Sequence, residues 1–179
     1  MMAANRRRTP RSSMTKAKAA LFALILAPLL MAAAPKERTT PSGLPVPRYV
    51  SLKFAQVNAR AGPGDDSRLL WVYRARGLPV QVVAETDEWR RICDPEGGLA
   101  WVHKRTTDGR RTVMRLSPQP LPIYDSAKTG ARVTAYLQSR ALAELDRCDK
   151  GWCKIKAGSK SGWTPADQVW GTTEAAQCR

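Results

Sequence analysis

The residues best suited to catalysis or metal binding are four cysteines and one histidine. Cys93, Cys148, Cys153, Cys178 and His103 are the only residues of their types in the 179-residue chain. A cysteine nucleophile needs a neighbouring base and a group that orients this base, and no motif supplies both. A metal bound by Cys148 and Cys153 needs two further ligands, and the chain has one histidine to offer. We therefore predict no catalytic residue, no metal and no cofactor.

Disulfide formation is the use that the cysteine count favours, because an even number is typical of chains that fold in an oxidising compartment. Cys148 and Cys153 flank residues 149–152, which predict a four-residue hairpin loop with Gly151 in an unusual backbone conformation. Opposed residues of a hairpin have Cα atoms about 4.5–5.5 Å apart, within reach of a disulfide. Pairing these two leaves Cys93 and Cys178 to each other, although four cysteines allow three connectivities.

Tryptophans are the residues best suited to binding. Trp89 and Trp152 each lie three positions before an isoleucine expected in the core, so strand alternation places them on outward faces beside a basic residue. An indole beside a cation can stack on a sugar ring or bind an extended peptide. We predict a ligand-binding site formed by Trp71, Tyr73, Trp89 and Trp152. The alternative is that Trp89 and Trp152 fill an interface inside the protein.

The elements that must position these residues are short strands. β-type runs occupy residues 49–59, 79–86, 89–93, 99–104 and 112–116, with turn signals at 62–66 and 97–98. No stretch shows a sustained helical period, so the fold class is all-β, with a small barrel or sandwich as the architecture.

The second half of this pattern repeats the first. The segment Trp89–Ile92 recurs 63 residues later as Trp152–Ile155, and Trp101 recurs 62 residues later as Trp163. Such matched separations indicate an internal duplication. Shifting Cys148 and Cys153 back by 63 residues gives Glu85 and Arg90, an opposite-charge pair typical of cross-strand neighbours.

At these residues the chain resembles the bacterial SH3-like domain family. Residues 57–64 match the opening signature of the family, and residues 89–92 and 98–102 match its Trp-x-x-Val and Gly-Trp-Val elements. Trp170-Gly171 is similar to the end of the exported two-repeat type, whereas residues 121–124 depart from the opening signature. The resemblance implies two tandem SH3-like small barrels, with Trp101 and Trp163 in their cores. It also implies binding to cell-wall peptides or glycans.

The N-terminal segment has the three parts of a secretory signal peptide. The first 34 positions contain six basic residues and no acidic one, and residues 19–34 are an uncharged run that ends in small side chains. This run is shorter than the roughly 20 residues of a spanning helix, which argues against the alternative of an uncleaved anchor. We predict a signal peptide at 1–33 and no membrane insertion after cleavage.

The remaining boundaries follow from composition and from the repeats. We expect a Pro-rich linker at 34–48, the first repeat at 49–114, the second at 115–171 and a C-terminal tail at 172–179.

The charge indicates the class of partner. The whole chain has a formal net charge of +15, and without residues 1–34 it keeps 24 basic and 15 acidic residues, or +9. Such a protein attracts anionic polymers. Export favours peptidoglycan or another envelope polymer, or an envelope protein, over nucleic acid.

Two functions therefore remain. The first is a periplasmic or secreted, non-enzymatic module that binds a cell-wall peptide, a glycan or another envelope polymer. The alternative is a periplasmic structural or protein-partner interaction protein that has no wall ligand.

Overall fold

The computed structural model describes residues 40–178. The predicted signal peptide at 1–33 and the linker up to residue 39 lie outside this range. Within it, the regular elements are antiparallel strands and two 3-10 turns, η1 (Lys104–Thr106) and η2 (Ala166–Gln168). The all-β class expected from the sequence is confirmed.

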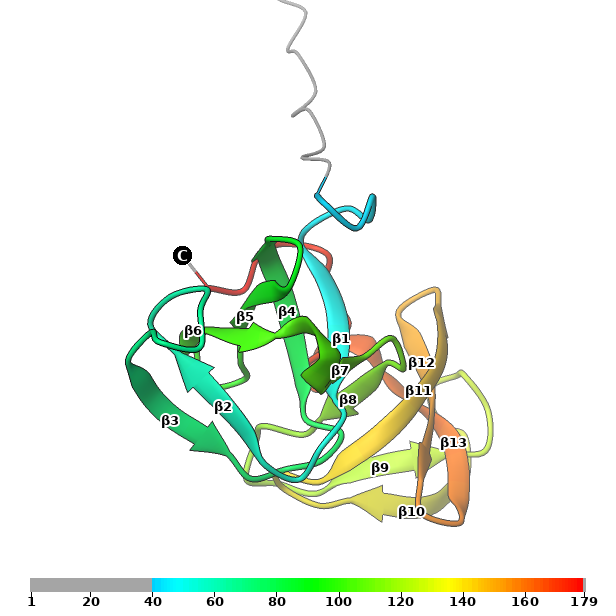
Figure 1. Ribbon diagram of the computed structural model, residues 1–179. Coiled ribbons are helices and arrows are strands. Elements are labelled where there is room, and N and C mark those ends of the chain that lie inside the picture. The colour runs from blue at the N-terminus through cyan, green and yellow to red at the C-terminus, as the bar shows by residue number, and fades with distance from the viewer. Residues whose placement is uncertain (1–39, 179) are drawn as a thin grey trace, which may run out of the picture. The chain divides into compact units, whose positions relative to one another are not determined.

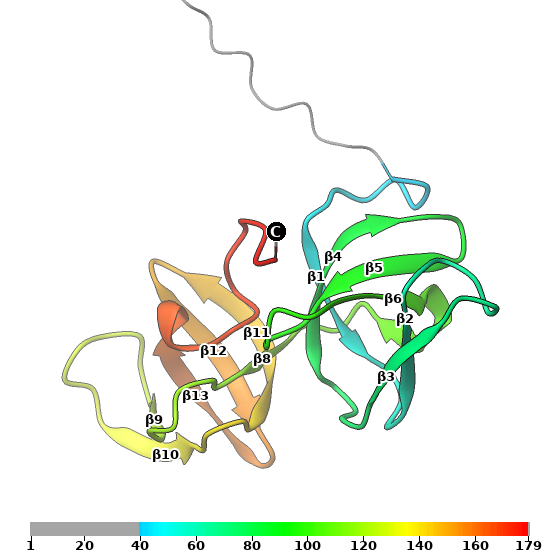
Figure 2. The ribbon, with the colours of Figure 1, turned by 90° about the vertical axis from the view of Figure 1, so that its left-hand side faces the viewer.

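The strands form two sheets (Figures 1 and 2). The first has the order β3-β2-β6-β5-β4-β1-β7 and the second the order β10-β9-β13-β12-β11-β8. The first sheet consists of β1 (Arg48–Leu52), β2 (Val57–Arg60), β3 (Leu69–Tyr73), β4 (Pro79–Glu85), β5 (Trp89–Cys93), β6 (Leu99–His103) and β7 (Thr107–Asp108). The second consists of β8 (Thr112–Met114), β9 (Leu121–Tyr124), β10 (Val133–Leu137), β11 (Leu142–Asp149), β12 (Trp152–Ala157) and β13 (Lys160–Pro165).

Each sheet encloses its own apolar core, built by the alternation of side chains along its strands. In β6, Ala100 and Val102 are buried while Trp101 between them is only half-buried. In β13, Gly162 lies so close to β9 that a Cβ there would be 2.6 Å from the Ile123 side chain. The glycine of the Gly-Trp element is therefore required by strand packing.

The strand β8 connects the two cores. It pairs with β11 in the second sheet, although its residues lie inside the range 49–114 expected for the first repeat. Its Val113 side chain packs in the second core and its Met114 side chain packs in the first. Because neighbouring strand residues point to opposite faces, one strand between two sheets can serve both cores. The boundary expected at residue 114 falls at the end of β8, so it assigns to the first repeat a strand that pairs in the second sheet.

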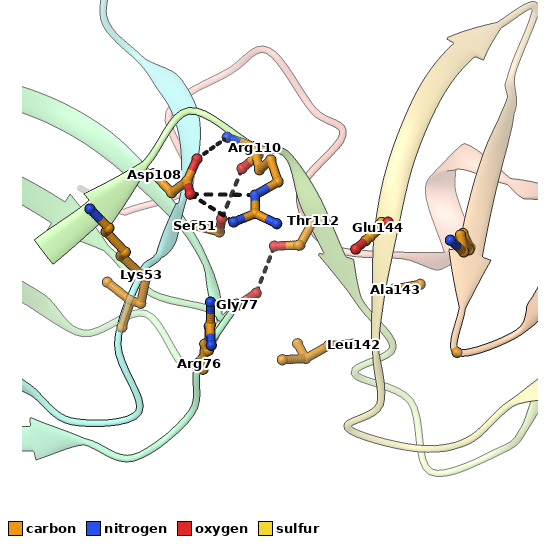
Figure 3. A pocket seen from close by; sticks show the side chains of 13 residues that line it. Ser51, Lys53, Arg76, Gly77, Asp108, Arg110, Thr112, Leu142, Ala143 and Glu144 are labelled. Atoms are coloured by element: carbon orange, nitrogen blue, oxygen red, sulfur yellow. Dashed lines mark hydrogen bonds and ion pairs between the residues drawn. The ribbon is translucent and has the colours of Figure 1, made fainter.

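Polar contacts also join β8 and the segment that precedes it to the first sheet (Figure 3). The Thr112 hydroxyl donates a hydrogen bond of 2.7 Å to the Gly77 carbonyl, and the Ser51 hydroxyl donates one of 2.9 Å to the Arg110 carbonyl. Both hydroxyl-bearing residues are buried. These bonds fix the loop that precedes β4 and the segment between β7 and β8 in one geometry.

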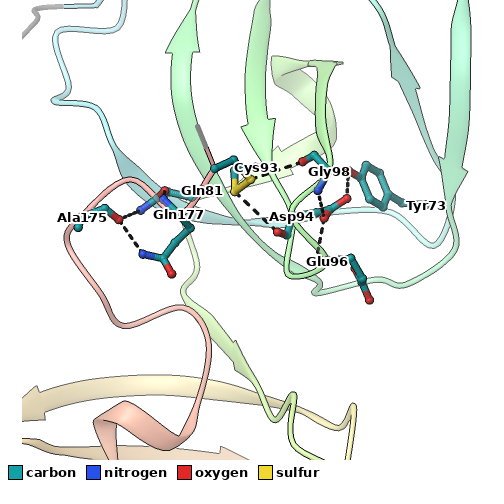
Figure 4. Close-up of a disulfide and its surroundings, with 9 residues drawn as sticks. Tyr73, Gln81, Cys93, Asp94, Glu96, Gly98, Ala175 and Gln177 are labelled. Atoms are coloured by element: carbon teal, nitrogen blue, oxygen red, sulfur yellow. Dashed lines mark hydrogen bonds between the residues drawn. A yellow bond between two sulfur atoms is a disulfide. The ribbon is translucent and has the colours of Figure 1, made fainter.

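The C-terminal tail returns to the first sheet (Figure 4). Gln81, a fully buried residue of β4, donates through its side-chain amide to the Ala175 carbonyl at 2.9 Å and accepts from the Gln177 backbone amide at 2.8 Å. Cys178 then forms a disulfide with Cys93 of β5, with the two Cα atoms 5.7 Å apart. The tail is thus held by backbone, side-chain and covalent bonds.

The second disulfide joins Cys148 and Cys153, which face each other in the register of β11 and β12 with Cα atoms 4.0 Å apart. The connection is shorter than the four-residue loop expected, because Asp149 and Trp152 are also paired. Lys150 and Gly151 both have positive φ, 47° and 80°, as a two-residue type I′ turn requires.

The described part of the linker, residues 40–48, is anchored to the first sheet. The Ser42 backbone amide donates to Glu85 Oε1 at 3.1 Å, and Arg48 Nη2 lies 2.5 Å from Glu85 Oε2. Arg90, the cross-strand neighbour of Glu85, contacts the same carboxylate at 3.3 Å. This carboxylate, 1 % exposed, therefore organises the start of the fold.

Candidate functional site

A pocket of about 500 Å³ lies on the first repeat beside Trp89. It is bordered by β2, the loop that follows β2, the start of β5, the end of β6 and η1. Its lining combines one large aromatic group with amides and charged groups of both signs. The lining residues are Gln56, Val57, Asn58, Arg60, Asp65, Trp89, His103, Arg105 and Thr106.

Trp89 is the aromatic wall of this pocket. It lies outside the apolar core of the first sheet, as the alternation argument expects, yet it is only 8 % exposed. Its cross-strand neighbour His103 explains the cover, because the two rings are 5.2 Å apart and inclined by 53°. The indole therefore lines the pocket while most of its surface is covered.

The polar groups of the pocket are held by the backbone around them. Arg60 Nη1 donates to the Ser67 carbonyl at 2.8 Å, which fixes its guanidinium against the loop that follows β2. The Arg105 backbone amide donates to His103 Nδ1 at 3.2 Å. The lining thus carries two permanent cations, Arg60 and Arg105, and one carboxylate, Asp65. Such a mixture suits a ligand with amide and carboxylate groups.

Trp71 and Tyr73 belong to a different environment. Both lie on β3 with their rings 5.9 Å apart, edge to face, and Trp71 packs against the first core. The Tyr73 hydroxyl donates to Asp94 Oδ2 at 2.8 Å. Burial, followed by the charge of Asp94 and its hydrogen bond, raises the pKa of Tyr73 far above its usual value. Neither residue lines the pocket beside Trp89.

The partner of Tyr73 is itself part of a buried network. Asp94 Oδ1 accepts from the backbone amides of Gly98 at 2.7 Å and Glu96 at 3.0 Å. These bonds close the turn between β5 and β6, and Tyr73 supplies a third donor. The hydroxyl of Tyr73 is thus committed to the fold.

Trp152 lies in the second repeat at the position equivalent to Trp89. Its cross-strand neighbour is Pro165, where Trp89 has His103. The Tyr124 ring packs against it edge to face at 5.7 Å. The second repeat therefore places a tyrosine and a proline beside its tryptophan, where the first repeat places polar side chains.

Trp101 and Trp163 do not occupy the cores, so that expectation is wrong. Both are half-buried and belong to neither core cluster. In the first sheet Trp101 pairs with the exposed Arg91, and in the second the Arg147 guanidinium lies 5.2 Å from the Trp163 ring. Alternation is the reason, because the residues that flank each tryptophan point inward.

Sequence reasoning missed most of the polar lining. Asn58 and Arg60 were within reach, since they belong to the signature at residues 57–64 that supported the resemblance. His103 and Arg105 belong to no motif that indicates a binding site. His103 and Arg105 line the pocket because β6 ends at His103 and η1 follows directly.

All four cysteines of the chain are in disulfides, which removes the metal alternative for Cys148 and Cys153. Among residues 40–178, no group of three or more His, Cys, Asp or Glu side chains is arranged to hold a metal ion. Over the same range, no helix has the length and apolar character needed to cross a membrane.

Comparisons with known proteins add a family match. The family model described as bacterial SH3 domain matches residues 53–109 and again residues 117–171. Each match falls on one of the two sheets, so the tandem arrangement expected from the sequence is confirmed. No curated protein matches the chain.

Two solved structures show limited similarity. NlpC1 and NlpC2 from Trichomonas vaginalis share 12 % and 13 % sequence identity with this chain, each with a TM-score of 0.32. The matches cover 75 % and 73 % of this chain but only 49 % and 51 % of the other two. This chain therefore spans about half their length, and such TM-scores are too low to transfer a function.

Proposed function

This chain belongs to the bacterial SH3 domain family, and on that premise we propose that it is an exported, non-enzymatic module that binds a cell-wall peptide or glycan. Other anionic polymers of the envelope fall within the same proposal. The pocket beside Trp89 is the observation that carries it. A volume of about 500 Å³ is ordinary for a small-ligand site, and a short peptide or a sugar unit fits within it.

The chemistry of the lining supports a peptide or glycan. Asn58 and Gln56 offer amide donors and acceptors, and Arg60 and Arg105 offer charge-assisted bonds to a carboxylate. The part of Trp89 that lines the pocket offers apolar contact. We place the ligand against Asn58, Arg60, Trp89 and Arg105. Trp71, Tyr73 and Trp152 take packing roles in this proposal.

The proposal also states that the protein is not an enzyme, and one observation supports this part. Both disulfides engage the only thiols of the chain, so no cysteine is available as a nucleophile. Disulfides also support residence in the periplasm or outside the cell, because reducing compartments do not maintain them.

Sedimentation with purified, insoluble peptidoglycan tests the proposal. Asn58→Ala and Arg105→Ala change exposed side chains of the pocket and should leave the fold intact. Arg68→Ala is the matched control, because Arg68 is also exposed and belongs to the neighbouring loop without lining the pocket. We expect wild type and Arg68→Ala to pellet, and each pocket variant to lose about fivefold or more in affinity, as for one charged or polar contact.

One outcome turns the proposal toward the alternative of a protein partner. If wild type stays in the supernatant at low salt, wall binding is wrong. The edge strand β10 then becomes the first surface to test, because Tyr136 is 59 % and Val133 39 % exposed there.

A further inference from the structure

A second hollow lies between the two repeats, away from Trp89 (Figure 3). Its volume is about 320 Å³, near the lower end for small-ligand sites. The first repeat supplies one wall from β1, the loop before β4 and the segment from β7 to β8. The second repeat supplies the other wall from β11 and from the end of β12. The comparisons with known proteins assign nothing to this groove.

The charged groups of the groove are unevenly balanced. Its lining contains the basic residues Lys53, Arg76, Arg110 and Lys156 but only two acidic residues, Asp108 and Glu144. Asp108 is already engaged, because its carboxylate accepts from the Arg110 side chain at 3.1 Å and from the Arg110 backbone amide at 2.9 Å. Figure 3 shows Lys53, Arg76 and Arg110 on one side and Glu144 on the other.

Three of these cations form no ion pair within the described residues, although Lys156 lies opposite Glu144 in the register of β11 and β12. Among residues 40–178, no carboxylate oxygen lies within 4.0 Å of the side-chain nitrogens of Lys53, Arg76 or Lys156. They come from both repeats and border one hollow. Like charges gathered around a concave surface raise the local positive potential, and an anion placed between them relieves it.

The floor beneath the cations is rigid. Leu52 and Ala143 are buried, and the hydrogen bonds of Ser51 and Thr112 described above fix the first-repeat wall. A fixed floor with flexible cations at its rim is suited to a small anionic group, because only the long side chains must be ordered on binding.

From this geometry we propose that the groove between the repeats is a second binding site, specific for a phosphate or carboxylate group on a ligand of the size of one sugar or one amino acid. Arg76 and Lys156 contact the anion from opposite walls. A ligand in this position touches both repeats, so its binding also stabilises their arrangement. The site does not depend on the pocket beside Trp89.

Titration of the ¹⁵N-labelled protein followed by NMR tests this site. The probes are inorganic phosphate and acetate, each added at an ionic strength held constant with sodium chloride. We expect the backbone amide signals of Gly77 and Gly158, which line the groove, to shift and saturate with at least one probe. Saturation with phosphate alone indicates a phosphate-bearing polymer as the source, and saturation with acetate indicates a carboxylate of a wall peptide.

Matched variants identify the groups responsible. Arg76→Gln and Lys156→Gln should each weaken binding of the probe about tenfold, the value expected for one charge-assisted hydrogen bond. Arg74→Gln is the control, because Arg74 is exposed two residues away, carries the same charge and does not line the groove. It should change the dissociation constant less than twofold.

Two results would overturn the proposal: signals that follow ionic strength without saturating, or an Arg74→Gln variant as weak as Arg76→Gln. Either would mean a general electrostatic field and no site. The amide signals of Asn58 and His103 report on the other pocket in the same spectra. Failure of wall binding there leaves a saturable groove standing, and failure of the groove leaves the wall proposal standing.

Discussion

Arg60 and Tyr124 occupy equivalent positions in the two sheets. Each pairs across antiparallel strands with a tryptophan, Arg60 with Trp101 and Tyr124 with Trp163. The Tyr124 ring packs against Trp152, whereas Arg60 lines an open pocket. At this position the first repeat has an arginine that lines a polar pocket, and the second repeat has a tyrosine that packs on a tryptophan. The two repeats have therefore diverged there.

Arg60→Tyr should bring the first repeat closer to the second. The new ring would occupy the pocket and remove a cation, so we expect peptidoglycan retention to fall at least tenfold, a loss typical of one charged contact. Tyr124→Arg is the reciprocal control and should leave retention unchanged. Retention is measured by sedimentation, with circular dichroism to verify folding. Equal losses in both variants would contradict the assignment of the ligand to the first repeat.

Tyr73→Phe distinguishes packing from ligand contact. The change removes the donor to the buried Asp94 carboxylate and should destabilise the fold by about 1–3 kcal/mol, because Asp94 loses a partner without gaining water. Urea denaturation measures this loss. Wall binding of the folded variant should equal that of wild type, since Tyr73 lies outside the pocket. Weakened binding at unchanged stability would restore Tyr73 to the site.

The two disulfides should differ in their effect on stability. Cys93–Cys178 spans 85 residues and Cys148–Cys153 spans five. In the chain-entropy account, the longer bridge contributes about 4.5 kcal/mol and the shorter about 2 kcal/mol. Paired Cys→Ser replacements, compared by urea denaturation under oxidising conditions, should reproduce this order. The reverse order would indicate that the tail adds little to the fold.

Glu85 should make the fold sensitive to acid. Burial opposes its charge, but hydrogen bonds from Ser42, Thr40 and Arg48 outweigh burial and lower the pKa of Glu85 to about 2. A pKa lowered on folding contributes stability that is present above the unfolded value, near 4.5, and is lost as the pH falls toward 2. The melting temperature of wild type should therefore fall between pH 5 and about 2.

Glu85→Gln is the matched comparison for this pH dependence. It keeps the shape of the side chain and removes its titration, so its melting temperature should be lower at pH 7 and should vary less between pH 5 and 2. A variant that parallels wild type at every pH would show that other carboxylates govern the acid response.

Strand class and register were available from local sequence. Period-two alternation indicates an all-β fold. The 63-residue repeat makes Cys148 and Cys153 equivalent to Glu85 and Arg90. The structure places the two cysteines opposite each other in the second sheet, and Glu85 opposite Arg90 in the first. These features depend on residues close in the chain. A hairpin brings such residues together whatever surrounds it.

The tertiary structure decided which side chains are covered and which converge. Trp89 lies on an outward face, as alternation predicts, but His103 covers it. Val113 and Met114 enter different cores because β8 lies between two sheets. The cations of the inter-repeat groove come from segments about 100 residues apart, such as Lys53 and Lys156. Alternation specifies the face of a strand on which a side chain lies. Whether that side chain is buried, and which other side chains lie beside it, depends on the segments from distant parts of the sequence that pack against that face.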